Sequence, residues 1–158
     1  MNAVARSALM IAAFAALSAA RADPSDAGAY AEAPRDPLLA QVIEANRAKD
    51  WPRSAELLRG ALAKSPDNAD YHNLYAFALR KGPSPDMKLV FRHYQEALRI
   101  DPKHRGAHEY LGEAYLMVGD LDGAKQHLRL LDRLCWFPCE EYSDLKEAIA
   151  EHERRARR

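Results

Sequence analysis

The chain has 158 residues, of which 48% are hydrophobic and 29% are charged. This composition excludes a disordered polar tail and a bundle of membrane-spanning helices, and the length suits one domain. Because 23 basic residues are balanced by 23 acidic residues, no net field attracts polyanions, and we expect no nucleic-acid partner.

The N-terminus has the pattern of a secretory signal peptide. Arg6 supplies a positive charge, an apolar run extends from Ser7 to Leu17, and small residues follow up to Ala22. The pattern predicts a signal peptide over residues 1–22, with cleavage after Ala22 and a mature protein that is periplasmic or secreted. The apolar run is too short to cross a bilayer comfortably. We therefore expect no stable membrane insertion after cleavage, and a retained anchor is the alternative.

Residues 23–34 form a predicted flexible leader, because they are rich in Ala, Pro and Asp and show no apolar period. From residue 35 onward, apolar residues recur at helical spacing, and Pro, Gly and Asp interrupt the pattern at regular intervals. The pattern predicts an all-α fold of repeated units. Three units align, over residues 35–68, 69–104 and 105–138, with a period of 34 to 36 residues.

The units share the signals that end a helix and that let two helices pack closely. Proline ends a helix at Pro66 in the first unit and at Pro102 in the second, since it lacks an N–H and clashes with the preceding turn. The third unit has the clearest interior signature, which consists of Tyr110-Leu111-Gly112, Ala114-Tyr115, Gly119-Asp120 and Ala124. Together these residues resemble the tetratricopeptide repeat (TPR) family. The resemblance implies a solenoid of helical hairpins, each with a helix A and a helix B, that binds a protein or an extended peptide segment.

Gly112 occupies a helix A position where neighbouring helices of this family approach closely, and Ala76 and Val42 take that position in the second and first units. A larger side chain than glycine there would force the helices apart. The insertion Gly82-Pro83-Ser84-Pro85 lengthens the turn of the second unit, which we expect to project as a rigid loop.

The pattern of residues 139–158 predicts a C-terminal capping helix. Tyr142, Leu145 and Ile149 form one apolar stripe, which would cover the exposed face of the third unit. Acidic residues near the start of this segment and arginines near its end complement the helix dipole.

The two cysteines, Cys135 and Cys139, lie at the predicted end of the third unit and at the start of the capping helix. In an oxidising compartment an even number of cysteines favours a disulfide, which would hold the cap against the last unit. Two alternatives stay open. One is a redox-active pair with a low-pKa thiolate at a helix N-terminus, and the other is a Cu(I) site formed by both thiolates.

The histidines and carboxylates form no pattern typical of a catalytic or metal site. His104 and His108 are one turn apart, but the motif H-E-x-x-H is absent. His72 and His108 fall at equivalent positions of their units, where we expect them to pack one helix against its neighbour. Glu109 and Glu113 are expected to be a solvated pair. Because a nucleophile elbow, a P-loop and a dinucleotide fingerprint are also absent, we expect no enzyme activity, no catalytic residue, no metal site and no cofactor.

The resemblance also implies a concave groove lined by helix A residues. The predicted groove residues are Asn46 and Arg47 in the first unit, with Leu39 and Ile43 beside them, Asn73, Phe77, Arg80 and Lys81 in the second, and Glu109, Glu113, Leu116 and Met117 in the third. This groove is basic in its middle and acidic, then apolar, toward the third unit, which suits an extended peptide with charged and hydrophobic side chains. A merely solvated surface is the alternative.

The sequence therefore favours a non-catalytic adaptor or assembly factor of the periplasm that holds a partner segment in this groove. The alternative is a thiol-based copper-handling or redox carrier that uses Cys135 and Cys139. A homodimer formed through the first unit also stays open. Replacement of both Arg80 and Lys81 by glutamate is expected to abolish partner binding without a change in helicity.

Overall fold

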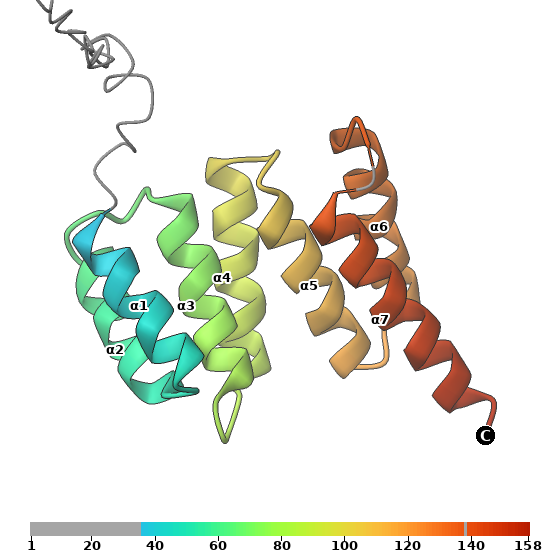
Figure 1. The fold of residues 1–158 in the computed structure, drawn as a ribbon, viewed down its shortest axis with the longest axis horizontal. Helices are drawn as coiled ribbons and strands as arrows, with labels where there is room; N and C mark the ends of the chain where they lie inside the picture. The colour runs from blue at the N-terminus through green and yellow to red at the C-terminus, as the bar shows by residue number, and fades with distance from the viewer. Residues whose placement is uncertain (1–35, 138) are drawn as a thin grey trace, which may run out of the picture. The chain divides into compact units, whose positions relative to one another are not determined.

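The computed structural model describes residues 36–137 and 139–158. The predicted signal peptide and leader lie outside the described residues. The described part of the chain contains seven α-helices and no strand, so the predicted all-α fold is confirmed (Figure 1). The helices are α1 (Pro37–Arg47), α2 (Trp51–Leu62), α3 (Ala69–Lys81), α4 (Met87–Ile100), α5 (Arg105–Met117), α6 (Leu121–Leu134) and α7 (Glu140–Ala156).

The helices pack as successive hairpins. Helix α1 contacts α2, α3 contacts α4 and α5 contacts α6, and each hairpin contacts the next through α2 with α3 and α4 with α5 (Figure 1). The predicted longer turn, residues 82–86, connects α3 to α4 (Figure 1). Helix α3 also contacts α5, and α5 contacts α7, so the first helices of neighbouring hairpins lie side by side. This is the solenoid of helical hairpins that the repeats predict.

Local side chains explain where the helices begin. Asp50, Asn68 and Asp120 each accept a hydrogen bond from a backbone N–H in the first turn of α2, α3 and α6, respectively. His104 does the same for α5, because its Nδ1 accepts a hydrogen bond from the N–H of Ala107 at 3.1 Å. His104 therefore lies immediately before α5 and caps its first turn.

The core consists of two clusters of buried apolar side chains. One cluster joins α3, α4 and α5 through Ala76, Val90, Tyr94, Leu111 and Ala114. The other joins α6 and α7 through Ala124, Leu131, Leu145 and Ile149. Val42 in α1 and Leu58 in α2 are fully buried as well. The buried residues of every hairpin therefore come from both of its helices.

Gly112 lets α7 approach α5 closely. A Cβ atom at Gly112 would lie 2.6 Å from Cδ2 and 2.7 Å from Cδ1 of Leu145, a side chain that is itself fully buried. Because the surroundings of Leu145 are packed, a larger residue at position 112 must displace either this side chain or the helix that carries it. The close approach expected at Gly112 thus has a specific partner in α7.

Helix α7 has the amphipathic character that the sequence predicts for the cap. Leu145 and Ile149 are buried, and Tyr142 packs against the same cluster. The helix contacts both α5 and α6, so it covers one side of the last hairpin. Among the helices that the structure describes, none is both long enough and apolar enough to cross a membrane.

Candidate binding surface

Half of the ten predicted groove residues gather around one hollow, which we call the α3–α5–α7 hollow. Its volume is about 530 Å³. It is lined by Arg80, Lys81, Glu113, Leu116 and Met117 from α3 and α5, and by Ala148, Glu151, His152 and Arg155 from α7. Asn46 and Arg47 lie at the end of α1 instead, and Arg47 lines a separate hollow of about 340 Å³ with Leu39 and Ile43.

The prediction that α7 is a cap does not include its four lining residues. The repeat period is the signal that identifies them. Ala148 lies one repeat length after Glu113, and His152 lies one repeat length after Met117. Helix α7 therefore continues the series of α3 and α5, in addition to covering the last hairpin.

Arg80 forms the centre of a buried cluster between α3 and α5. Its Nη2 lies 2.5 Å from Oε2 of Glu113, and its Nε donates a hydrogen bond to the hydroxyl of Tyr94 at 3.2 Å. The guanidinium carbon lies 5.7 Å from the ring centroids of both Phe77 and Tyr110, within the range of cation–π attraction. Burial acts to lower the pKa of Arg80, but Tyr94 and Glu113 outweigh it and raise that pKa above its usual value.

The prediction that the middle of the groove is basic is therefore wrong for Arg80. Arg80 is only 6% exposed, and its charge is neutralised by Glu113. Lys81 is the exposed cation at this place, and its ammonium lies 5.8 Å from the ring centroid of Phe77. Phe77 in turn packs between Trp51 and Tyr110, with ring centroids 5.7 Å and 4.8 Å away.

The expectation of a solvated Glu109–Glu113 pair is also wrong. Glu113 is half-buried and bound to Arg80, and Glu109 is only 7% exposed. Burial raises the pKa of Glu109 to about 8, and the nearby carboxylates of Glu113, Asp144 and Glu141 add to the increase. The sequence pattern of α5 alone does not indicate this increase, because Asp144 and Glu141 belong to α7, the helix that packs against α5.

Asn73 is the groove residue that precedes Glu109 by one repeat. It is only 5% exposed, and its amide oxygen has no hydrogen-bond partner among the residues that the structure describes. A Cβ atom at Gly106 would lie 3.4 Å from Nδ2 of Asn73, so this side chain lies against the first turn of α5. The amide oxygen of Asn46 in α1 is likewise buried without a described partner.

Two histidine pairs repeat along the array, one in each of the last two hairpins. Nδ1 of His72 lies 2.8 Å from Nδ1 of His93, and Nδ1 of His108 lies 2.9 Å from Nδ1 of His127. The Nε2 atoms of His72 and His108 contact the carbonyl oxygens of Pro66 and Pro102 at 2.8 Å and 3.1 Å, respectively.

Because a carbonyl oxygen only accepts, these contacts assign the Nε2 proton to His72 and His108. Their Nδ1 atoms then accept a hydrogen bond from the Nδ1–H of His93 and His127. Burial, together with the facing histidine of each pair, lowers the pKa of both donors to about 4. His72 and His108 thus pack α3 on α4 and α5 on α6. An alignment of the units reveals their partners, because His93 and His127 also occupy matching B helices.

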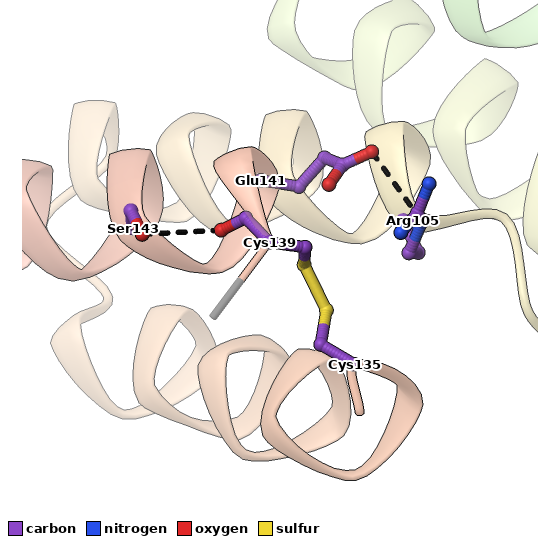
Figure 2. The surroundings of a disulfide bond; sticks show 5 residues. All are labelled: Arg105, Cys135, Cys139, Glu141 and Ser143. Carbon is purple, nitrogen blue, oxygen red and sulfur yellow. Dashed lines mark hydrogen bonds and ion pairs between the residues drawn. A yellow bond between two sulfur atoms is a disulfide. The ribbon is translucent and has the colours of Figure 1, made fainter. Parts of the chain in front are cut away.

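The cysteines lie between α6 and α7, where the structure joins their sulfur atoms (Figure 2). The Cα atoms of Cys135 and Cys139 are 5.8 Å apart, a separation that suits a disulfide. The hydroxyl of Ser143 donates a hydrogen bond to the carbonyl oxygen of Cys139 at 3.1 Å, and Arg105 contacts Glu141 nearby at 3.4 Å (Figure 2). Within residues 36–137 and 139–158, no group of three or more histidine, cysteine or acidic side chains is placed to hold a metal ion.

Comparison with curated proteins identifies relatives that contain TPR repeats. A TPR repeat-containing thioredoxin of Arabidopsis thaliana is 30% identical over 82 residues, which are 52% of this chain and 12% of the relative. A TPR repeat-containing protein of Pseudomonas aeruginosa is 38% identical over 73 residues, which are 45% of this chain and 66% of the relative. The chain thus spans less than two thirds of the length of either relative. No protein-family model matches it.

Solved structures with the same fold are TPR domains and TPR-like chaperones. The Sgt2 TPR domain of Aspergillus fumigatus has a TM-score of 0.64 at 21% identity, over 76% of this chain and 77% of that one. The TPR2B domain of yeast Sti1, in complex with an Hsp70 peptide, has a TM-score of 0.65 at 15% identity, over 75% and 94%. PcrH, in complex with the chaperone binding region of PopD, has a TM-score of 0.61 at 18% identity, over 76% and 90%. The repeat signature, the stacked helical hairpins and these similarities have one explanation, which is that the chain belongs to the tetratricopeptide repeat family.

Proposed function

We propose that this protein is a non-catalytic adaptor or assembly factor of the periplasm, and that it binds an extended segment of a partner protein in the α3–α5–α7 hollow. The observation that carries the proposal is the composition of this hollow. Leu116, Met117 and Ala148 provide apolar surface, and Lys81 and Arg155 provide exposed positive charge beside it. A segment with both hydrophobic and charged side chains is complementary to such a surface.

The similar structures support a protein segment as the ligand. The TPR2B domain of Sti1 is in complex with an Hsp70 peptide, and PcrH is in complex with a region of PopD. Since these similarities are of fold, they favour the class of ligand and leave its sequence open. The predicted signal peptide supports the periplasmic location, because a cleaved signal places the mature chain outside the cytoplasm.

The test must use exposed side chains, and Arg80 is unsuitable. A glutamate at position 80 would place a second carboxylate beside Glu113 in the interior, so the double replacement of Arg80 and Lys81 would unfold the cluster rather than report on binding. Lys81→Glu combined with Arg155→Glu reverses two exposed charges of the hollow. The matched control is Arg92→Glu combined with Arg129→Glu, which reverses two exposed charges on α4 and α6.

Affinity capture from the periplasm, with mass spectrometry of the bound proteins, compares these variants with the wild type. We expect the hollow variant to lose the captured partner and the control variant to keep it. Both variants should retain wild-type helicity by circular dichroism. Equal capture by all three proteins contradicts a binding role for the hollow. The dimer through the first unit stays a prediction, which sedimentation of the mature protein tests.

A further inference from the structure

Four carboxyl groups of α5 and α7 lie near one another, and they differ in how they are neutralised. One of them, Glu113, lines the α3–α5–α7 hollow. The four groups are those of Glu109 and Glu113 of α5 and Glu141 and Asp144 of α7. Glu113 is bound to Arg80 at 2.5 Å, and Glu141 is bound to Arg105 at 3.4 Å. Asp144 is exposed to solvent. Glu109 is the exception, because it is only 7% exposed and neither of these two ion pairs includes it.

An uncompensated buried carboxyl group is costly, because burial removes its hydration without a substitute. The groups that face Glu109 do not offset this cost. Glu113 on its own helix and Glu141 and Asp144 on α7 repel a negative charge, and Arg80 on α3 attracts it but is already bound to Glu113. The raised pKa of Glu109, about 8, is consistent with a carboxyl group that stays protonated near neutral pH in the free protein.

Asn73 provides a second, independent observation on the neighbouring helix. Its buried amide oxygen is an acceptor without a described donor, and its side chain lies against Gly106, one turn before Glu109 on α5. Two adjacent A helices thus present unused acceptors at equivalent repeat positions. Acceptors in this number suit a ligand that brings several N–H donors and a positive charge.

We propose that Glu109, together with Asn73, binds one lysine or arginine side chain of the partner segment. This inference rests on the proposed function, because it specifies the chemistry of the segment that occupies the α3–α5–α7 hollow, which Glu113, one turn after Glu109 on α5, lines. A metal ion is a poorer occupant, since no three side chains among the described residues converge as metal ligands. The nearby rings of Phe77 and Tyr110 already attract cations, as their contacts with Arg80 show.

Selection from a displayed library of random twelve-residue peptides tests the proposal on the mature protein. We expect the selected peptides to share a lysine or arginine at a fixed position. Glu109→Gln should weaken a selected peptide at least about tenfold, as the loss of a hydrogen bond to a charged group predicts. Glu147→Gln, the same change at an exposed position of α7, should leave the affinity unchanged. Replacement of the selected cation of the peptide by glutamine should weaken binding to the wild type as much as Glu109→Gln does. The same replacement should not weaken binding to the Glu109→Gln variant any further.

A second readout follows from the protonated state of Glu109. Calorimetry at pH 7 in two buffers of different ionisation enthalpy should detect release of a proton when the peptide binds, and this release should vanish in Glu109→Gln. Wild-type binding without proton release overturns the assignment to Glu109. Because glutamine resembles the neutral acid in shape, the variant should fold, which its helicity verifies.

The outcomes separate the inference from the proposed function. The selected peptides can bind the Lys81→Glu and Arg155→Glu variant more weakly and yet share no cation, or bind Glu109→Gln as tightly as the wild type. Either result supports the proposed function and overturns the inference. Selection of no peptide at all, or of peptides that are indifferent to both variants, contradicts the proposed function and the inference with it.

Discussion

Arg80 and Lys81 are adjacent cations on α3 that have different environments. Arg80 is enclosed by Phe77 and Tyr110 and bound to Glu113, whereas Lys81 is exposed. A planar guanidinium can satisfy several acceptors and stack on aromatic rings at the same time, which an ammonium cannot do. We infer that Arg80 fixes the relative position of α3 and α5, and that Lys81 is free to contact a ligand.

Arg80→Met should lower the free energy of unfolding by about 3 kcal/mol or more, because it leaves the carboxylate of Glu113 without its cation beside a packed core. Lys81→Met should change it by less than about 0.5 kcal/mol, as expected for an exposed position. Urea denaturation followed by circular dichroism measures both values. Combining Arg80→Met with Glu113→Leu should recover much of the loss, and equal effects of the two single changes contradict a structural role for Arg80.

The histidine pairs make stability depend on pH. The pKa values of His93 and His127 are lowered to about 4 by burial and by the histidines that face them, whereas unfolded histidine titrates near 6.5. Between these values the unfolded chain binds more protons than the folded chain. The stabilisation is therefore complete above pH 6.5 and is lost as the pH falls to 4, by up to about 1.4 kcal/mol per pH unit for each histidine.

Glu109 acts in the opposite direction, since its pKa is raised to about 8 and its proton is held more tightly by the folded chain. The Glu109→Gln variant removes this contribution, so its stability should fall more steeply than that of the wild type when the pH decreases from 6.5 to 4.5. Urea unfolding at several pH values measures both slopes. Folded-state titration of His93 and His127 near pH 6.5, observed by NMR, contradicts the prediction.

At the scale of helices, α7 both covers the last hairpin and lines the hollow, and the sequence pattern predicts only the first of these. The apolar stripe of Tyr142, Leu145 and Ile149 predicts a cap, and the structure confirms that Leu145 and Ile149 are buried. The polar face of the same helix contributes Glu151, His152 and Arg155 to the hollow. Because α7 packs on both α5 and α6, its apolar face covers the last described hairpin while its polar face lines the hollow.

The close approach of α5 and α7 predicts an energetic coupling between Gly112 and Leu145. Gly112→Ala should destabilise the protein by about 1–3 kcal/mol, since its Cβ would overlap Leu145, although the better helix propensity of alanine offsets part of this. Leu145→Ala should cost about 2–5 kcal/mol by creating a cavity. The double variant should be more stable than the sum of the two changes predicts, and additive values from urea denaturation would refute the contact.

The elements were predictable from the sequence because their signals are local. Asp50, Asn68 and Asp120 cap the starts of helices, Pro66 and Pro102 lie in the turns that follow α2 and α4, and small residues mark close packing. Burial of charged groups was not predictable in the same way. It depends on which helix lies across from a residue, and an i, i+4 carboxylate pair such as Glu109 and Glu113 resembles an exposed pair until α3 and α7 are in place.

At the scale of the whole molecule, the described helices follow one another in a row, and α7 contacts α5 and α6. Each helix of a repeat protein is stabilised mainly by adjacent helices, so the attachment of α7 depends on these neighbours. Helix α7 is attached to the rest by its contacts with α5 and α6 and by two ion pairs, Lys125 with Glu153 at 2.6 Å and Arg105 with Glu141 at 3.4 Å. Between α6 and α7, Trp136 and Phe137 are 98% and 81% accessible and therefore add little packing.

We propose that a disulfide between Cys135 and Cys139 compensates for this weak connection. Its short loop limits the entropic stabilisation to about 2 kcal/mol, so its main effect should be local, on the placement of α7. In the Cys135→Ser and Cys139→Ser variant, hydrogen exchange should therefore accelerate in α7 and stay unchanged in α3 and α4. Partner capture should decrease as well, since α7 lines the hollow.

Wild-type protein treated with a reductant is the matched control, and it should reproduce the accelerated exchange of α7. Titration of the untreated mature protein should detect no free thiol, which supports a structural role of the cysteines. Two titratable thiols, with Cu(I) bound at one equivalent and lost in Cys139→Ser, would favour the thiol-based carrier instead. Faster exchange spread evenly over all helices would show that the bond acts on the stability of the whole array, and that α7 needs no separate attachment to complete the binding surface.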